Sequence, residues 1–182
     1  FMAACTLLVY LASCHSSSPQ DTTDTISVTQ MPPATTPDAF NAKMDTVLNT
    51  YYQLKDAFFA ADTGRADEMA GLLKIAVDSL PLQLLQPDSV KYGKAHIAAE
   101  SLLGEIAGLE GEHTIKNKQV EFGMISDIMY DLVRAVGLKH QTVYRQFCPM
   151  AFDHKGGYWL SNKEEIENPY YGKKMPDCGE VK

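Results

Sequence analysis

The sequence contains little cysteine, no basic stripe and no apolar run long enough to cross a bilayer. Its clearest uncharged apolar run, residues 3–12, is about half as long as the roughly 20 residues that a membrane-spanning helix needs. The 182 residues include 16 Lys and Arg against 23 Asp and Glu, a formal net charge of −7. An acidic chain without a basic stripe binds phosphates poorly, so we expect no nucleic-acid partner.

The motifs of the common enzyme classes are also missing. The sequence has no Ser-His-Asp arrangement, no glycine-rich phosphate loop and no His-Glu-x-x-His motif. We therefore expect no catalytic activity. One enzymatic alternative stays open: Cys148 as a nucleophile, with His140 or His154 as its base.

Leu11-Ala12-Ser13-Cys14 closes the apolar run and resembles the lipobox of bacterial lipoproteins, whose cysteine is lipidated and becomes the first mature residue. No Lys or Arg precedes the run, so we expect residues 1–13 to be an N-terminally truncated signal peptide. A diacylglycerol thioether and an N-acyl group on Cys14 would give the multiple chains that durable membrane anchoring requires. The alternative is a buried helix that ends in cysteine. The run Ser16-Ser17-Ser18-Pro19 that follows disfavours it.

Residues 14–37 are mostly Ser, Thr, Pro, Gln and Asp. This composition cannot bury a core and predicts a flexible tether. As a random coil it would span on the order of 25 Å, enough to separate a domain from the lipid headgroups.

Residues 38–137 carry four amphipathic patterns in which apolar residues recur every three or four positions, as on one face of a helix. Thr36, Pro37 and Asp38 predict the first helix start, with a capping hydroxyl, a proline in the first turn and an acid at the positive helix end. Gly137 predicts the last helix end. Short links between the helices predict an antiparallel up-down four-helix bundle. The four seams are Phe40, Met44, Val47, Tyr51, Leu54 and Phe58; Ala66, Met69, Leu73, Ala76 and Leu80; Ala95, Ala99, Leu102, Ile106 and Leu109; and Phe122, Ile125, Met129, Leu132 and Val136.

Residues 138–182 lose the helical period and are punctuated by Gly and Pro. Residues 143–147 and 158–160 predict short strands, with a turn over residues 153–157. We expect a small irregular and β C-terminal Cys/Met module packed on the bundle. The predicted fold class is mainly α.

The C-terminal stretches are similar to one known pattern. They are residues 143–152 (VYRQFCPMAF), 157–161 (GYWLS), 168–172 (NPYYG) and 178–181 (CGEV), together with Met175; residues 51–55 (YYQLK) add a weaker signal. From about Val47 to the C-terminus the chain resembles the domain of unknown function 3347 family, found mainly in Bacteroidetes. That family occurs as small secreted proteins and lipoproteins, and fused to periplasmic adaptors of heavy-metal efflux pumps. It has no assigned reaction.

The resemblance implies a place and a partner. It points to an envelope lipoprotein on the periplasmic side of a Gram-negative membrane, with exposure on the outer surface as the alternative. An efflux adaptor or another envelope protein would be its partner.

Cys148 with Met150, and Met175 with Cys178, place two thiols and two thioethers in two short clusters. Soft sulfur ligands favour Cu(I) over hard cations. His154 or His140 lies near enough in sequence to add an imidazole. We therefore expect an accessory of heavy-metal efflux or homeostasis that binds a soft metal, most simply copper.

The alternative at the same residues is a disulfide. Cys5 would leave with the signal peptide and Cys14 would be lipidated, so Cys148 and Cys178 would be one pair in an oxidising compartment. A cysteine in a disulfide is a poor metal ligand, so the two interpretations exclude each other. The sequence leaves open a disulfide-stapled interaction scaffold beside the copper site.

The other titratable clusters are predicted to be solvated surface groups. They are the pair His96 and Glu100, the group Glu110, Glu112 and His113, and the run Glu164, Glu165 and Glu167. The aromatic residues Tyr158, Trp159, Tyr170 and Tyr171 are predicted to fill the core of the C-terminal module.

Overall fold

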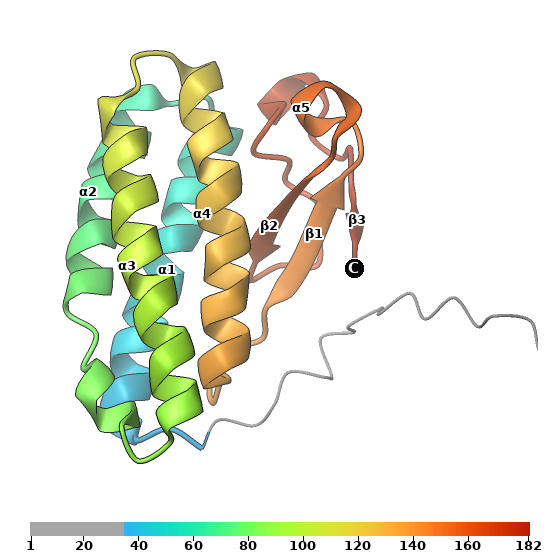
Figure 1. The fold of residues 1–182 in the computed structure, drawn as a ribbon. Helices are drawn as coiled ribbons and strands as arrows, with labels where there is room; N and C mark the ends of the chain where they lie inside the picture. Colours follow the sequence, from blue (N-terminus) through green and yellow to red (C-terminus); the bar gives the residue numbers. More distant parts are fainter. Residues whose placement is uncertain (1–34) are drawn as a thin grey trace, which may run out of the picture.

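The computed structural model describes residues 35–182, in which four long helices run up and down beside a small sheet (Figure 1). The helices are α1 (Asp38–Phe59), α2 (Thr63–Asp78), α3 (Ser89–Gly111) and α4 (Ile115–Val136), and the 3-10 helix η2 (Leu82–Leu85) joins α2 to α3. The C-terminal elements are β1 (Tyr144–Cys148), α5 (Ala151–His154), β2 (Gly157–Ser161), η3 (Gly172–Lys174) and β3 (Glu180–Val181). The predicted mainly α fold class is confirmed. The lipobox, Cys14 and most of the predicted tether lie outside the described residues.

Three of the four long helices begin at a side-chain cap. Asp62 accepts a hydrogen bond from the Arg65 backbone N–H, and Asp88 and Thr114 cap α3 and α4 in the same way. The prediction that Thr36 caps α1 is wrong. Pro37 occupies the N-cap position, and the buried Thr36 hydroxyl instead donates to Asn41 Oδ1 at 2.6 Å.

Every predicted seam residue of the four helices is buried, so the predicted core is confirmed. These side chains form one hydrophobic cluster that continues into the C-terminal module through Cys148, Trp159 and Leu160. Removing this apolar surface from water is the main term that stabilises the fold. Within residues 35–182, no helix is both long and apolar enough to cross a membrane.

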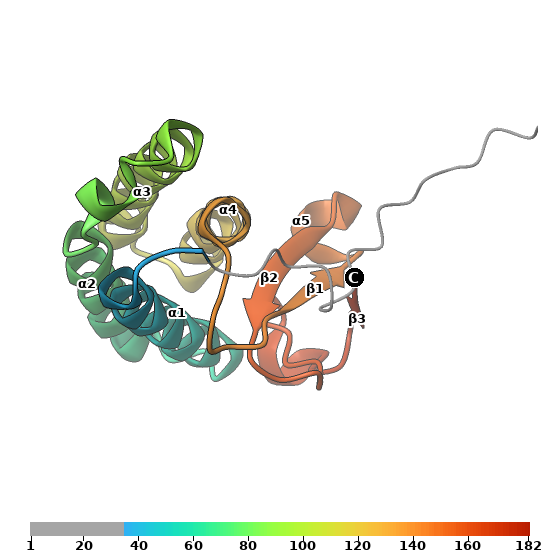
Figure 2. The same cartoon turned by 90° about the horizontal axis from the view of Figure 1, so that it is seen from below.

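The C-terminal module lies on one side of the bundle, next to α1 and α4 (Figure 2). Strand β2 packs on α4 and also contacts α1. The buried Tyr51 hydroxyl of α1 joins the two layers, because it accepts a hydrogen bond from the Leu160 backbone N–H at 3.0 Å and lies 2.7 Å from Ser126 Oγ on α4. The module is therefore docked on the bundle by a buried polar contact as well as by apolar packing.

The sheet is antiparallel in the order β2-β1-β3. Both predicted strands are present, and Cys148 pairs with Gly157 at the end of β1. Strand β3 was not predicted. It pairs only through Gln146 with Val181 and Phe147 with Glu180, and two residues are too few to show a period in the sequence.

Two charged contacts also tie the layers together. Lys55 on α1 is fully buried, and its Nζ lies 2.7 Å from Glu167 Oε2 in the module. The Arg145 guanidinium lies between the rings of Tyr130 and Tyr158, 4.0 and 3.8 Å from their centroids, an arrangement that cation–π attraction favours. Because Glu167 is half-buried and pairs with the buried Lys55, the prediction that it belongs to a solvated acidic run is wrong.

Candidate functional site

The sheet brings the two C-terminal cysteines together. Cys148 ends β1 and is fully buried, whereas Cys178 is half-buried in the segment that leads into β3. Their Sγ atoms are 3.1 Å apart, and both are free thiols in the structure. The hydrogen bond to Cys148 raises the pKa of Cys178 above its ordinary value. A thiol with a raised pKa is a weaker nucleophile at neutral pH, because less of it is thiolate.

Asn168 positions the Cys178 segment. This buried side chain donates from Nδ2 to the Cys178 carbonyl at 2.6 Å, and its Oδ1 accepts hydrogen bonds from the backbone N–H groups of Tyr170 and Tyr171. We did not predict this role. An Asn followed by Pro is a turn signal, so the Asn168-Pro169 dipeptide was the available clue.

The other predicted sulfur ligands form a less complete set. Met150 is exposed. Met175 is half-buried, and its backbone carbonyl accepts a hydrogen bond from the Cys178 N–H. His154 is exposed in α5, and His140 lies 3.5 Å from Asp45 on α1. Among residues 35–182, no three His, Cys, Asp or Glu side chains are grouped so that they could hold a metal ion. The structure therefore brings together Cys148 and Cys178, and it places His140 beside Asp45.

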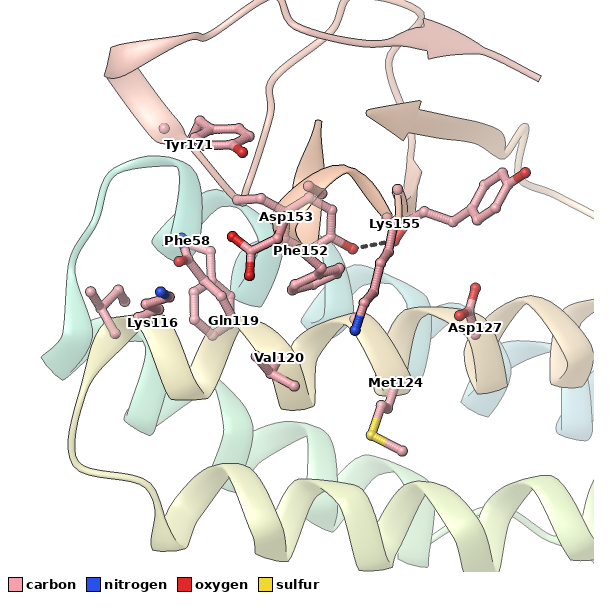
Figure 3. A pocket seen from close by; sticks show the side chains of 18 of the residues that line it. Phe58, Lys116, Gln119, Val120, Met124, Asp127, Phe152, Asp153, Lys155 and Tyr171 are labelled. Atoms are coloured by element: carbon pink, nitrogen blue, oxygen red, sulfur yellow. Dashed lines mark hydrogen bonds between the residues drawn. The ribbon is translucent and has the colours of Figure 1, made fainter. Parts of the chain in front are cut away.

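A groove of about 830 Å³ lies between the bundle and the module (Figure 3). We call it the α4–module groove. One stripe of α4 forms its floor: Ile115, Lys116, Gln119, Val120, Gly123, Met124 and Asp127. The opposite wall comes from residues 151–153, 155–158 and 170–172 together with Lys174, and Phe58 and Ala61 lie at one end. Its volume is in the range of small-molecule sites, which bind apolar bodies and orient them with a few polar groups.

Two glycines allow the groove wall to approach its floor. The Phe152 ring lies so close to Gly123 on α4 that a Cβ there would stand 2.9 Å from Cζ of the ring. A Cβ on Gly157 would lie 2.8 Å from both the Phe152 and the Tyr170 rings. The aromatic wall therefore depends on the missing side chains at Gly123 and Gly157.

The turn above the groove is conformationally strained. Phe152, Asp153 and His154 have φ values of 54, 56 and 67°, so three successive non-glycine residues are left-handed. Such residues cost on the order of 1–3 kcal/mol each and are concentrated at ligand clamps and other functional sites. The sequence predicts a turn here. Asp153 and His154 are of residue types that adopt left-handed φ more readily than most, but Phe152 gives no sign of it.

The charges that line the groove differ from those of the chain as a whole. Lys116, Lys155 and Lys174 line it, and none of them forms an ion pair within the described part of the chain. Two carboxylates line it as well. Asp153 is exposed, and Asp127 lies 3.8 Å from Arg145. Partial burial raises the pKa of Asp127, although the Arg145 charge opposes this shift.

The other side chains that were predicted to be solvated surface groups make the following contacts. His96 and Glu100 form an exposed pair at 3.4 Å. Glu110 pairs with Lys74 on α2 at 2.7 Å, and half-buried Glu112 accepts a hydrogen bond from Asn117.

Comparison with known proteins gives one match. A family model described as "Protein of unknown function (DUF3347)" matches residues 47–141, just over half of the chain. The match begins at Val47, where the resemblance was expected to begin. It ends before β1, so the C-terminal stretches that carried the resemblance lie outside it. Searches of curated proteins and of solved structures found no match.

Proposed function

The chain belongs to the DUF3347 family of proteins of unknown function, and we propose that it is a lipid-anchored, non-enzymatic binding protein of the cell envelope. The observation that carries the binding function is the α4–module groove, which combines apolar residues of α4 with an aromatic wall and three lysines. The resemblance of residues 11–14 to a lipobox supports the anchor and the location on the periplasmic side of the membrane.

The cysteine pair supports this proposal as a staple of the groove wall. Cys148 and Cys178 flank the whole segment that forms that wall, and their Sγ atoms are 3.1 Å apart. In an oxidising compartment such a pair forms a disulfide. A loop of 30 residues closed in this way stabilises a fold by about 3.6 kcal/mol in the chain-entropy model. The staple would keep the groove formed before its ligand arrives.

Native mass spectrometry of the mature protein, released from its own envelope without reductant, tests the groove. We compare the wild type with Val120→Trp, which fills the groove, and with Val90→Trp on α3. Both valines are exposed, at 45% and 66%. We expect a small molecule bound to the wild type and to Val90→Trp, and none bound to Val120→Trp. A bare mass for all three proteins contradicts the proposed binding function.

The same samples show whether the two cysteines form a disulfide and whether Cys14 carries the lipid anchor. A protein lighter by two hydrogens that resists thiol alkylation contains the disulfide, and reductant should then lower its stability by about 3.6 kcal/mol. The intact mass of the detergent-extracted protein should include a diacylglycerol and an N-acyl group on Cys14. A mature protein that begins at Cys14 without acyl groups would contradict the lipid anchor.

A second candidate function is favoured by the same pair of sulfur atoms. In the reduced state, Cys148 and Cys178 would offer two adjacent thiols to Cu(I), with Met150 and Met175 nearby in sequence, and the protein would act as an accessory of heavy-metal efflux. Anaerobic Cu(I) titration of the reduced protein against a competing chelator tests this. An affinity no better than that of Cys148→Ser/Cys178→Ser excludes it.

A further inference from the structure

The α4–module groove is long and follows one helix. Its floor extends from Ile115 to Asp127, a rise of about 18 Å at the helical repeat. Between the ends, exposed Val120 and Met124 face the half-buried Phe152 ring. An elongated apolar body therefore fits this floor better than a compact polar one.

One end of the groove is positively charged. Lys116 is in the first turn of α4, and within the described residues the backbone N–H groups of Ile115 and Lys116 have no acceptor. Lys174 belongs to η3, which lies against the Phe59 carbonyl at the same end of the bundle. The positive end of the α4 dipole adds to these two ammonium groups. One hydrogen of Gln119 Nε2 is donated to the Pro169 carbonyl at 2.8 Å, so that hydrogen does not contact a ligand anion.

Lys155, Asp153 and Asp127 also line the groove, so it carries both signs of charge besides Lys116 and Lys174. In Figure 3 the Lys155 side chain extends from the module toward Met124 on α4, and the Asp153 carboxylate lies near the Phe58 and Phe152 rings. Asp127 marks the far end, where Arg145 partly balances it. Phe58 is near the end of α1, so Asp153 lies on the same side of the groove as Lys116, where two ammonium groups outnumber its one carboxylate. Asp127 repels an anion from the far end, so an anionic group is favoured beside Lys116 and Lys174.

We propose that the α4–module groove binds an elongated amphipathic anion, an inference that rests on the binding function proposed above. Its anionic head contacts Lys116, Lys174 and the N-terminus of α4, and its apolar chain lies along Val120 and Met124 under the Phe152 ring. A free fatty acid and the acyl chain of an anionic lipid share this chemistry.

Calorimetric titration of the full mature chain, after removal of copurified ligand, tests the inference with three probes of one chain length. These are dodecanoate, dodecanol and dodecyltrimethylammonium. We expect dodecanoate to bind about tenfold more tightly than dodecanol, because charge-assisted hydrogen bonds are roughly twice as strong as neutral ones, and the cationic probe to bind weakest. Vesicles of anionic and of zwitterionic lipid form a second arm, which separates a free acid from a membrane lipid as the source.

Four variants locate the head and the chain. Lys116→Gln/Lys174→Gln should weaken dodecanoate binding about tenfold and leave dodecanol binding unchanged. Asp153→Asn should strengthen dodecanoate binding, and Val120→Trp should abolish binding of all probes. Lys94→Gln, an exposed lysine of α3, is the matched control and should change nothing. Thermal melts check that each variant is folded.

The outcomes separate this inference from the function on which it rests. If dodecanoate and dodecanol bind equally well and Lys116→Gln/Lys174→Gln has no effect, the ligand is not an anion. A neutral apolar ligand of the groove would then remain. Preference for the cationic probe also overturns the anionic ligand. Failure of every probe to bind, together with a bare native mass from the envelope, overturns the binding function itself.

Discussion

At the scale of the residue, the contacts that dock the module depend on a few buried polar side chains. Ser126 Oγ donates to the Phe122 carbonyl at 2.8 Å, so the hydrogen of the Tyr51 hydroxyl is left to donate to Ser126 Oγ. Burial raises the pKa of Tyr51 well above its ordinary value, so this hydrogen stays in place. Tyr52, the next residue, is also buried, but within the described residues its hydroxyl has no hydrogen-bond partner.

These two tyrosines form a matched pair of substitutions. Tyr51→Phe leaves the buried Leu160 N–H without an acceptor, and we expect it to lower the free energy of unfolding by about 1–3 kcal/mol. Tyr52→Phe removes a buried hydroxyl that makes no bond, so it should be neutral or stabilising. Urea unfolding followed by circular dichroism measures both. Equal losses in the two variants would show that the Tyr51–Leu160 contact contributes nothing specific.

A second residue-scale prediction concerns pH. Partial burial acts to raise the pKa of Glu167, but hydrogen bonds and charge from Lys55 and Lys163 prevail and hold it below its ordinary value. Stability from this carboxylate is therefore present above the unfolded pKa of about 4.5 and is lost as the pH falls through the lower folded value. Glu167→Gln should cost about 1.5–3 kcal/mol at pH 7 and show a weaker loss of stability on acidification.

Urea unfolding at pH 7 and in the acid range checks this. Glu164→Gln is the control, because Glu164 is exposed and has no ion pair in the described part of the chain. A wild type and a Glu167→Gln variant that lose stability in parallel on acidification would contradict the assignment.

The sequence could not have revealed these docking residues. Tyr51 was correctly predicted as a seam residue. However, Leu160, whose N–H donates a hydrogen bond to the Tyr51 hydroxyl, lies 109 positions away. Lys55 and Glu167 each look like solvated charges when only their neighbours in sequence are considered. Their pairing arises when the module packs on α1, an event that local patterns do not encode.

At the scale of the element, the joint between η3 and α1 depends on one glycine. Gly172 has a φ of 54°, and a Cβ there would lie 2.8 Å from the Phe59 carbonyl oxygen. Backbone atoms at the end of α1 cannot move aside as a flexible side chain can. The joint therefore has no room for any other residue.

Gly172→Ala should accordingly lower the free energy of unfolding by about 2 kcal/mol or more, from left-handed strain and overlap together. Gly104→Ala is the contrasting change, because a Cβ on this exposed α3 residue would meet nothing within 4 Å. It should stabilise the protein by about 0.5–1 kcal/mol through helix propensity. Chemical denaturation measures the stability of both variants. A Gly172→Ala variant more stable than the wild type would contradict the close approach of Gly172 to the Phe59 carbonyl.

The helices were more predictable than the module for a physical reason. An amphipathic helix repeats its burial every few residues, so Phe40 to Phe58 and Phe122 to Val136 can be recognised from spacing alone. In the module, burial depends on single contacts such as those of Asn168 and Gly172. The predicted turn over residues 153–157 illustrates the limit: its place was right, and its left-handed backbone at Phe152, Asp153 and His154 was not foreseen.

At the scale of the whole molecule, bundle and module share one core and should unfold together. The chain's single tryptophan, Trp159, is fully buried in β2 and reports on the module, whereas the far-ultraviolet circular dichroism comes mainly from the bundle helices. We expect both signals to change at the same urea concentration, as in a two-state transition. A Trp159 transition at lower urea than the helical one would mean that the module detaches first.

The candidate site belongs to this largest scale. The sequence singled out Cys148 and Cys178, and the structure places their Sγ atoms 3.1 Å apart, while the disulfide and the metal site at this pair stay predictions. The α4–module groove was not predicted, since Lys116 and Lys174 line one groove only when η3 and the start of α4 reach the same end of the bundle. Val120 and Met124 were the available clue, because they are apolar residues on α4 outside its buried seam.

The shortness of β3 bears on solubility. The outer edge of the sheet offers another protein molecule only the backbone of Glu180 and Val181, and Lys182 beside them already donates its N–H to the Arg145 carbonyl. Short, charged edges of this kind are poor templates for strand addition, which is how exposed sheets begin to aggregate. Even at high local concentration, the protein would therefore be protected from edge-to-edge association along β3.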